Sequence, residues 1–354
     1  MPDEPTPRQR VLRTLAHESV DRVPTDFWAE PKTWENLKAH FKTESKSEVL
    51  RQLEVDIRTV TPTYVGPPPK VYPDGSITNE WGMRKRITLT DFGSEIVDFV
   101  EPPLRQASSA AEVAAHPWPS ADWWDVSDLQ QKIDTINCDN EYFIRCHIGS
   151  ILESTWALRG FEQTFLDLGQ GSLIPGLIFD HLTQKLIEIG EMILDAAGGR
   201  IDAIFTWDDF GGQQNLLMSP TLIRRELVPR HRRIIDAFHK YGTRVFFHSD
   251  GAVYPLLNDF INMGVDVLNP LQSRAKGMDL PKIKQLFGDK LGFHGAIDIQ
   301  QTLPFGTIED VQAEVRNRVE VLGRNGGYIL CPEHYLQPDT PMENIVALYD
   351  PALR

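Results

Sequence analysis

Four of the ten histidines stand at or near the ends of short apolar segments, so the residues capable of chemistry are concentrated. One of them, His248, is followed two residues later by Asp250, and residues two apart on a strand point to the same side. The other three are His147, His294 and His334. Imidazole and carboxylate groups at one place can bind a divalent ion or act as general acid and base. These spacings predict one chemical site built from segments far apart in the chain.

A metal centre is the first interpretation of this group, with His248, Asp250 and His334 as ligands. Cys331 and Glu333 lie next to His334 and are alternative ligands, since thiolates and carboxylates also bind zinc. Three protein ligands and an open fourth position are what a catalytic zinc requires. The other interpretation is a metal-free cluster, in which Asp250 orients a histidine that works as general acid or base.

Two adjacent carboxylates, Asp208 and Asp209, end another apolar segment. Neighbouring residues on a strand point to opposite sides, so one is expected to face the site and the other to bond a loop. Two nearby carboxylates can raise the pKa of one of them and make it a general acid. The alternative is that they order the loop by accepting hydrogen bonds from the amides of Gly211 and Gly212.

Further residues at such segment ends are expected to contact a substrate. Arg145 and His147 alternate with Cys146, so both are expected to face inward, where an unsatisfied polar pair is costly. They therefore contact a substrate or belong to a buried network. The other expected substrate contacts are Trp28, His294 and Asp298.

The elements that must position these residues are eight apolar, β-branched segments of the kind buried on both faces of a parallel sheet. Eight strands alternating with helices predict a single (β/α)8 TIM-type barrel over residues 1–354, with function at the carboxyl ends of the strands. A doubly wound open sheet is the alternative, but no Gly-x-Gly-x-x-Gly follows the first segment. The expected strands are 23–28, 56–62, 142–148, 203–209, 244–250, 265–271, 291–297 and 327–333.

Capping residues indicate where several helices begin. Ser219 and Pro220 open a helix expected over 221–239, so Ser219 is interpreted as a cap rather than a nucleophile. Thr307 opens a helix expected over 308–322. Apolar residues at helical spacing also predict helices over 182–197 and 254–263.

Residues 63–141, between the second and third strands, are too many for a simple helical crossover. Pro73-Asp74-Gly75 is a turn signal between two candidate strands, so a β-hairpin is expected in this insertion. The insertion could cover the barrel mouth as a lid, or it could pack against the side of the barrel.

The composition is that of an ordinary globular protein, with 41% hydrophobic and 24% charged residues among 354. The net charge of −14 argues against nucleic acid and against an anionic membrane surface, since both select clustered Lys and Arg. Three cysteines without a Cys-x-x-Cys pair indicate a reducing compartment. MPDEPTPRQR lacks the apolar core of a signal peptide, and no run of 18 apolar residues occurs. We therefore expect a cytoplasmic protein.

Four segments of the C-terminal part resemble the uroporphyrinogen decarboxylase superfamily, which includes zinc-dependent methyltransferases acting on corrinoids or coenzyme M. The N-terminal RQRVLRTLAHESVDRVP also resembles the start of many members. The resemblance is weak over the insertion and implies a (β/α)8 barrel. The four segments are DDFGGQQNLLMSP, RVFFHSDGAVYPLLNDFINMGVDVLNPLQSRAKGMD, LGFHGAIDIQQTLPFGT and GGYILCPEHYLQPDTPMENIVALYD.

The resemblance implies a modified metal site. The methyltransferases carry His-x-Cys-Gly where this chain has His248-Ser249-Asp250-Gly251, and His334 falls at the position of their second zinc cysteine. The implied ligand set is therefore His248, Asp250 and His334, with Zn²⁺ or another divalent metal, and a corrinoid carrier protein as the implied partner. A carboxylate in place of a thiolate favours a harder, more oxophilic metal role.

A classical uroporphyrinogen decarboxylase is not expected. Such enzymes carry a Met-Arg-Gln-Ala-Gly-Arg segment after the first strand, whereas this chain reads DFWAEPKTWENL without an arginine. Their substrate bears eight carboxylates, which need fixed guanidinium groups.

Three hypotheses follow from the sequence. The first is metal-assisted methyl (one-carbon) transfer or demethylation of a small substrate, with a corrinoid carrier as one candidate acceptor of the methyl group. The second is metal-free decarboxylation of a small acid, with Lys32, Arg145 and Arg159 as candidate cationic contacts. The third is a binding module with a degraded site. A homodimer is the expected assembly.

Overall fold

The computed structural model describes residues 4–354 and contains a curled, all-parallel sheet of seven strands. Consecutive strands are neighbours throughout, in the order β1-β7-β8-β9-β10-β11-β12, as expected when each crossover carries helices. Seven of the eight expected strands are therefore present and parallel. They are β1 (Ile57–Thr59), β7 (Phe143–Ser150), β8 (Ala203–Trp207), β9 (Arg244–His248), β10 (Val267–Asn269), β11 (Gly292–Ile297) and β12 (Tyr328–Pro332).

The first expected strand, 23–28, is reduced to two isolated bridges, Thr25 to Leu330 and Ala29 to Leu336. It nevertheless lies between the two edges of the sheet. The Asp26 amide donates to the Leu330 carbonyl on β12 at 3.0 Å, and the Asp56 amide donates to the Thr25 carbonyl at 3.0 Å. The architecture is consistent with a TIM-type barrel in which this segment takes the place of a regular strand.

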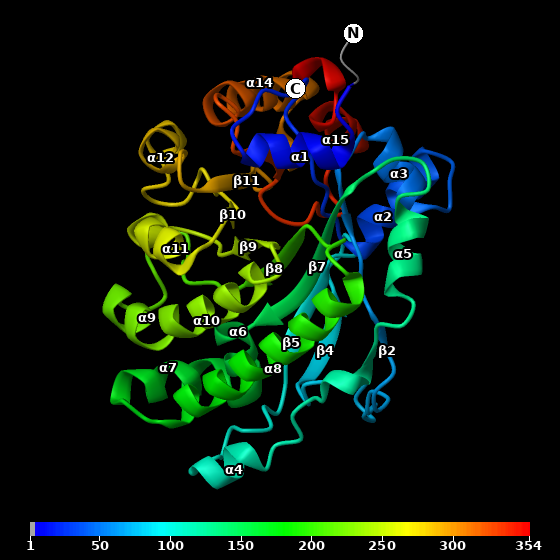
Figure 1. The fold of residues 1–354 in the computed structure, drawn as a ribbon. Coiled ribbons are helices and arrows are strands. Elements are labelled where there is room, and N and C mark those ends of the chain that lie inside the picture. Colours follow the sequence, from blue (N-terminus) through cyan, green and yellow to red (C-terminus); the bar gives the residue numbers. More distant parts are fainter. Residues whose placement is uncertain (1–3) are drawn as a thin grey trace.

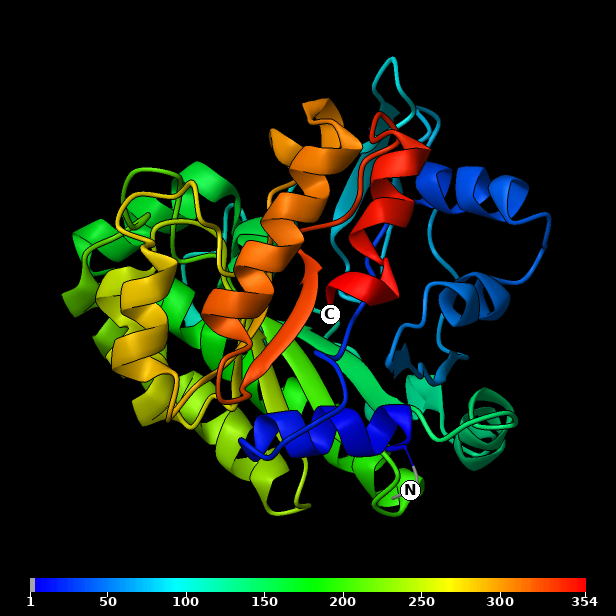
Figure 2. The same ribbon diagram turned by 90° about the horizontal axis from the view of Figure 1, so that it is seen from above.

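Helices surround the curled sheet, and α1 lies across one end of it (Figure 2). The Gly327 amide, just before β12, donates to the Thr14 carbonyl, so α1 covers the amino-terminal ends of the strands. Within residues 4–354, every helix is too short or too polar to span a bilayer. The helices outside the insertion are α1 (Pro7–Leu15), α2 (Pro31–His40), α3 (Lys46–Gln52), α6 (Leu152–Arg159), α7 (Phe161–Gln170), α8 (Ile174–Ala197), α9 (Pro220–Glu226), α10 (Val228–His239), η2 (Tyr254–Leu256), α11 (Leu257–Met263), α12 (Leu280–Phe287), α13 (Thr302–Phe305), α14 (Ile308–Leu322), α15 (Met342–Leu348) and η3 (Pro351–Leu353).

Sequence signals explain where these helices begin, and one expected helix is broken. The Ser219 hydroxyl accepts from the Leu222 amide at 3.2 Å, which confirms its capping role. Thr307 and Asp310 form a capping box at the start of α14.

The single helix expected over 221–239 is wrong, because it divides at Leu227 into α9 and α10. Pro229 lies in the first turn of α10, where its missing N–H costs no hydrogen bond, whereas inside one long helix it would break the ladder.

The insertion between β1 and β7 contains short antiparallel strands, short helices and irregular segments (Figure 1). β4 and β5 pair over five residues, and β3 pairs with β4. A separate pair, β2 with β6, joins the two ends of the insertion. Its elements are β2 (Thr63–Tyr64), β3 (Ile77–Thr78), β4 (Arg84–Leu89), β5 (Glu95–Phe99), α4 (Ala110–Ala114), η1 (Ala121–Trp123), β6 (Trp124–Asp125) and α5 (Leu129–Ile136).

The barrel interior is apolar at the end covered by α1 and polar at the other. Val11 of α1 is fully buried against strand residues such as Phe143 and Phe246. Asp26, Arg145 and other charged side chains lie buried as well. Burying a charge is costly unless it is paired, so the fold must supply partners for each of them.

Asp56 is a buried carboxylate that joins the segment before β1 to the N-terminal part of the chain. Its two oxygens accept from Arg10 at 2.6 Å, from Arg22 at 2.7 and 3.0 Å, and from the Thr25 amide at 2.8 Å. Its side chain is completely buried. These contacts hold α1 and the bridging segment in place against β1.

We expect Asp56→Ala to destabilise the protein strongly, because two guanidinium groups would lose their shared buried partner. The loss should be about 3–5 kcal/mol, as for other broken buried pairs. Asp134→Ala is the control, since Asp134 pairs with Arg200 on the surface and such pairs contribute about 1 kcal/mol or less. The unfolding midpoint in guanidinium chloride measures both variants. Equal midpoints for the two would show that the Asp56 cluster does not hold the barrel.

Candidate active site at the barrel mouth

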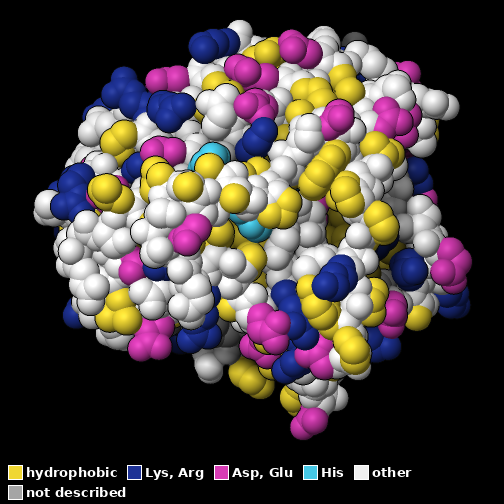
Figure 3. Space-filling model, turned by 90° about the horizontal axis from the view of Figure 1, so that it is seen from below, with side chains coloured by type: hydrophobic (Ala, Val, Ile, Leu, Met, Phe, Trp, Pro, Cys, Tyr) yellow, Lys and Arg dark blue, Asp and Glu magenta, His cyan; other side chains and the backbone are white. Residues whose placement is uncertain are grey.

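The structure brings His248, Asp250 and His334 together at the carboxyl ends of β9 and β12. Each offers one donor atom, and the three atoms lie within 4.8 Å of one another. His248 Nε2 is 3.7 Å from Asp250 Oδ1. That Asp250 oxygen is buried and has no hydrogen-bond partner among the described residues. On the face opposite α1, histidine side chains reach the surface beside hydrophobic ones (Figure 3).

A chain of hydrogen bonds behind His248 fixes which of its nitrogens carries the proton. His294 Nε2 lies 2.9 Å from Asp26 Oδ2, which can only accept. His294 Nδ1 is then free to accept from the Asn269 amide nitrogen at 2.6 Å. The Asn269 oxygen accepts from His248 Nδ1 at 2.5 Å. His248 Nε2 is therefore left with its lone pair directed to the mouth, the state in which histidine binds a metal or accepts a proton.

Asp26 anchors this chain in its ionised form. It forms a buried ion pair with Arg145, and the Trp28 indole donates to it at 2.9 Å. Burial alone would raise the pKa of Asp26, but Arg145 and the hydrogen bond from His294 hold it well below its ordinary value. Arg145, Trp28 and His294, expected to contact substrate, thus form a buried polar network beneath the mouth.

The two adjacent carboxylates have different roles, as their alternation on a strand suggested. Asp209 faces the site, with Oδ1 3.7 Å from His248 Nε2, and accepts from the Asp250 amide at 2.9 Å. Asp208 points the other way and is fully buried, where it pairs with His231 at 2.7 Å. It also accepts from the amides of Ile151 and Glu153 before and within α6. Neither bonds the glycine amides expected for them.

Glu153 adds a further carboxyl group that the sequence analysis did not single out. Its Oε1 accepts from the Asp209 amide at 3.1 Å. Burial, and then Asp209 and Asp208, raise the pKa of Glu153 to about 9. Burial, and then Asp209, raise the pKa of Asp250 to about 7. Burial lowers the pKa of His248 and of His334, so both imidazoles are neutral near pH 7. The mouth therefore holds acidic groups, and among residues 4–354 no Lys or Arg forms an ion pair with Glu153, Asp209 or Asp250.

Several expected site residues lie elsewhere. Asp298 accepts from the amides of Gln300 and Gln301 and pairs with Arg274. The Glu333 carboxylate accepts from the Ser273 amide at 2.9 Å, away from His334. Cys331 is buried in the barrel interior, and burial raises the pKa of its thiol well above the ordinary value.

The cationic contacts proposed for an acid substrate also have other partners. Arg159 pairs with Asp167 and donates to the carbonyl groups of residues 104, 105 and 107. Lys32 forms an exposed pair with Glu35. Neither arrangement leaves a free charge directed at the mouth.

A second group of potential metal ligands, Asp26, His294 and Cys331, lies deeper in the barrel. Asp26 already binds the Arg145 guanidinium and the His294 imidazole. A metal ion there would compete with a fixed positive charge and require an unfavourable thiolate. The mouth group, with its unpartnered carboxylate oxygen, is the better candidate.

A cavity of about 550 Å³ adjoins the mouth between the barrel and the insertion. His147, Ser150 and Glu153 line it from β7 and α6, and Trp207 lines it from β8. Trp81, Met83, Phe99 and Trp124 line it from the insertion. No Lys or Arg belongs to this lining. The insertion therefore supplies one wall of the cavity next to the candidate site.

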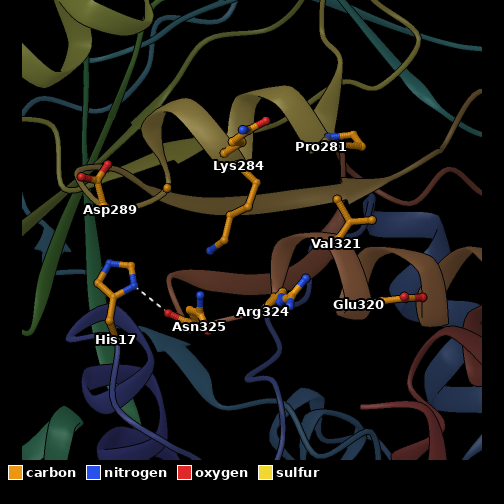
Figure 4. A pocket seen from close by; sticks show the side chains of 10 residues that line it. His17, Pro281, Lys284, Asp289, Glu320, Val321, Arg324 and Asn325 are labelled. Carbon is orange, nitrogen blue, oxygen red and sulfur yellow. Dashed lines mark hydrogen bonds between the residues drawn. The ribbon is translucent and has the colours of Figure 1, made fainter.

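A larger cavity of about 850 Å³ lies at the other end of the barrel, between α12, α14 and the loop after α1. Lys284 extends into it from α12, and His17 contacts Asn325 at its edge (Figure 4). These groups already have backbone partners, since Lys284 donates to the Gly326 carbonyl at 2.5 Å. Barrel enzymes place their chemistry at the carboxyl ends of the strands, so this cavity is not the candidate active site.

Comparison with solved structures supports the fold. A methyltransferase from Methanosarcina mazei matches with a TM-score of 0.68 and 18% identity, over 98% of this chain and 97% of that chain. A β-L-arabinopyranosidase from Geobacillus stearothermophilus matches with a TM-score of 0.40 and 9% identity, over 95% of this chain and 76% of the other. The first similarity establishes a shared fold.

Comparison of sequences identifies the family. No curated protein matches the chain at a significant level. The family model described as uroporphyrinogen decarboxylase (URO-D) matches residues 175–352, which is half of the chain. This span contains β8 to β12 and all three mouth residues. The chain therefore belongs to the uroporphyrinogen decarboxylase family.

Proposed function

We propose that this protein transfers a methyl (one-carbon) group from a small substrate with the help of a divalent metal ion. The observation that carries the proposal is the hydrogen-bond chain that leaves His248 Nε2 unprotonated, next to the unpartnered Asp250 oxygen. His248, Asp250 and His334 are the proposed ligands. Two neutral imidazoles and a carboxylate suit Zn²⁺ or another divalent ion. When bound, such an ion would supply Lewis acidity at the mouth of the barrel, beside the place of methyl transfer.

The surrounding side chains have roles in orientation and proton handling. Asn269 holds the His248 ring, and Asp209 adds negative charge beside it at 3.7 Å. Because its pKa is raised to about 9, Glu153 keeps a proton on its carboxyl group near neutral pH. It can hold or release that proton according to the charge of the molecule bound beside it. Trp28 and the aromatic residues of the cavity exclude water around the reacting atoms.

The finer features of the proposal come from the family and from the cavity. The insertion 63–141 acts as a lid or wall over a small-molecule substrate. A corrinoid protein is the proposed methyl acceptor. A homodimer in the cytoplasm is the proposed state of the protein.

The two other hypotheses have less support. An acid substrate needs a fixed cation, and the cavity next to the mouth has no Lys or Arg in its lining. A binding module with a degraded site would not need a hydrogen-bond chain that keeps His248 Nε2 unprotonated. Carbon dioxide release from a small acid by the metal-free protein would nonetheless favour decarboxylation.

We expect the protein as purified to contain about one divalent ion per chain and to demethylate a member of a panel of methoxylated and methylated-amine compounds. Formation of methylcobalamin from reduced cobalamin measures turnover, and elemental analysis measures the metal. His248→Ala should lower both about tenfold or more. His181→Ala is the control, because His181 stacks on Trp118 outside the site. A metal-free protein whose His248→Ala variant keeps full activity contradicts the proposal.

We expect Asn269→Leu to weaken the affinity for Zn²⁺ by about 10–100-fold, since residues that orient a ligating histidine have effects of this size. Competition with a chelator measures the affinity. Asn344→Leu is a matched control: Asn344 is almost as buried as Asn269 and bonds two carbonyls of the α13 segment instead of a histidine. Asn269→Asp should restore part of the affinity, because a carboxylate still accepts from His248 Nδ1. If both leucine variants lose the same affinity, Asn269 has only a general role in stability.

A further inference from the structure

Four large aromatic side chains line the cavity beside the mouth. Trp207 from β8, Trp81 and Trp124 from the insertion, and Phe99 at the end of β5 all line it. Aromatic rings present a negative face, so rings gathered around a cavity attract a cation that can shed its water. Aromatic walls can also bind a neutral apolar molecule. The charged groups of the lining therefore determine whether a cation or a neutral molecule binds better.

The charged groups of this lining are acidic. Glu153 and Glu80 both face the cavity, and no Lys or Arg shares the lining with them. Burial raises the pKa of Glu153, and the nearby carboxylates of Asp209, Asp208 and Asp250 raise it further. A buried carboxyl group surrounded by other carboxylates is relieved when a positive charge arrives. A cationic ligand would therefore supply the positive charge that the lining lacks.

We propose that this cavity binds a small methylated ammonium ion, and that such an ion is the substrate class of the site. The inference rests on the proposed function, because it names the molecule that carries the methyl group. The aromatic rings hold the methyl groups of the cation, and Glu80 balances its charge. The arriving cation also favours ionisation of Glu153, whose carboxyl group is otherwise protonated near neutral pH. Neither glutamate belongs to the proposed ligand set of His248, Asp250 and His334, so both stay available to the ammonium when a divalent ion is bound.

His147 supports a cation with an N–H bond. Its Nε2 atom is buried and has no hydrogen-bond partner among the described residues, and the ring belongs to the cavity lining. Burial lowers the pKa of His147 to about 3, so the ring is neutral and adds no competing positive charge. With Nδ1 carrying the proton, Nε2 can accept from the N–H of a protonated amine or, in the choline probe, from the hydroxyl group. A neutral methoxylated molecule would leave Glu80 without a counter-charge.

The test compares two probes of the same shape that differ in charge, choline and 3,3-dimethyl-1-butanol. Quenching of tryptophan fluorescence and calorimetry measure binding to the protein as purified. We expect choline and tetramethylammonium to bind, and choline to bind at least about tenfold more tightly than its neutral isostere. Equal affinity for choline and the isostere, or no binding of either ammonium ion, overturns the inference.

Substitutions then test whether Glu153 and Glu80 balance the charge of the bound cation. Glu153→Gln keeps the acceptor for the Asp209 amide but cannot ionise when the cation arrives, so choline affinity should fall about fivefold or more while the isostere is unaffected. Glu80→Gln, in the insertion, should act in the same direction and covers the case in which Glu153→Gln does not fold. Glu188→Gln on α8, where Glu188 pairs with Lys185, is the control. Choline affinity that survives both cavity substitutions contradicts the assignment.

The outcomes separate this inference from the proposed function. If the protein binds ammonium ions but transfers a methyl group from no compound of the panel, the inference stands and the proposed function fails. If it demethylates a neutral methoxylated compound and binds no ammonium ion, the proposed function stands and the inference fails.

Discussion

The buried ion pair between Asp26 and Arg145 is the constraint on which the mouth of this barrel depends. Removing two charges from water is costly, and their attraction offsets the cost only where further hydrogen bonds satisfy the remaining atoms. Asp26 meets this condition with His294 and the Trp28 indole. Once Asp26 is fixed as an acceptor, the proton positions on His294, Asn269 and His248 follow in order. An ion pair deep in the barrel thus decides which nitrogen faces the mouth.

The interior of the barrel is apolar at one end and polar at the other, where this ion pair lies. At the amino-terminal end, Val11 of α1 packs on phenylalanines of the strands, and no polar chain is needed there. At the carboxyl-terminal end, the strands leave the sheet, and their last residues are free to point into the mouth. The segment that carries Asp26 is bonded to both sheet edges, so its carboxylate is held rigidly between them. An irregular first strand is therefore compatible with a precise site.

The sequence predicted the parts of this structure that depend on local pattern. The seven parallel strands, the caps at Ser219 and Thr307, and the grouping of His248 with His334 follow from apolar runs, cap chemistry and strand ends. The break at Leu227 was missed because a first-turn proline and an interior proline look alike in a helical pattern. Asp26, Asn269 and Glu153 were missed because their importance comes from partners far along the chain. A charged residue inside the run VPTDFW, and an asparagine at the end of the β10 segment, were the available signals.

The carboxylate of Asp250 affects the electrostatics of the whole mouth. A carboxylate that is buried beside Asp209 and Glu153 repels its neighbours, so each proton or cation that enters is bound more tightly. A metal ion at His248, Asp250 and His334 would remove only part of this repulsion, because Glu153 faces the aromatic cavity rather than the three ligands. Glu80 and the ionisable Glu153 lie where the proposed substrate binds. In the proposed function, the Asp250 carboxylate therefore both makes the metal site harder and favours a positively charged substrate.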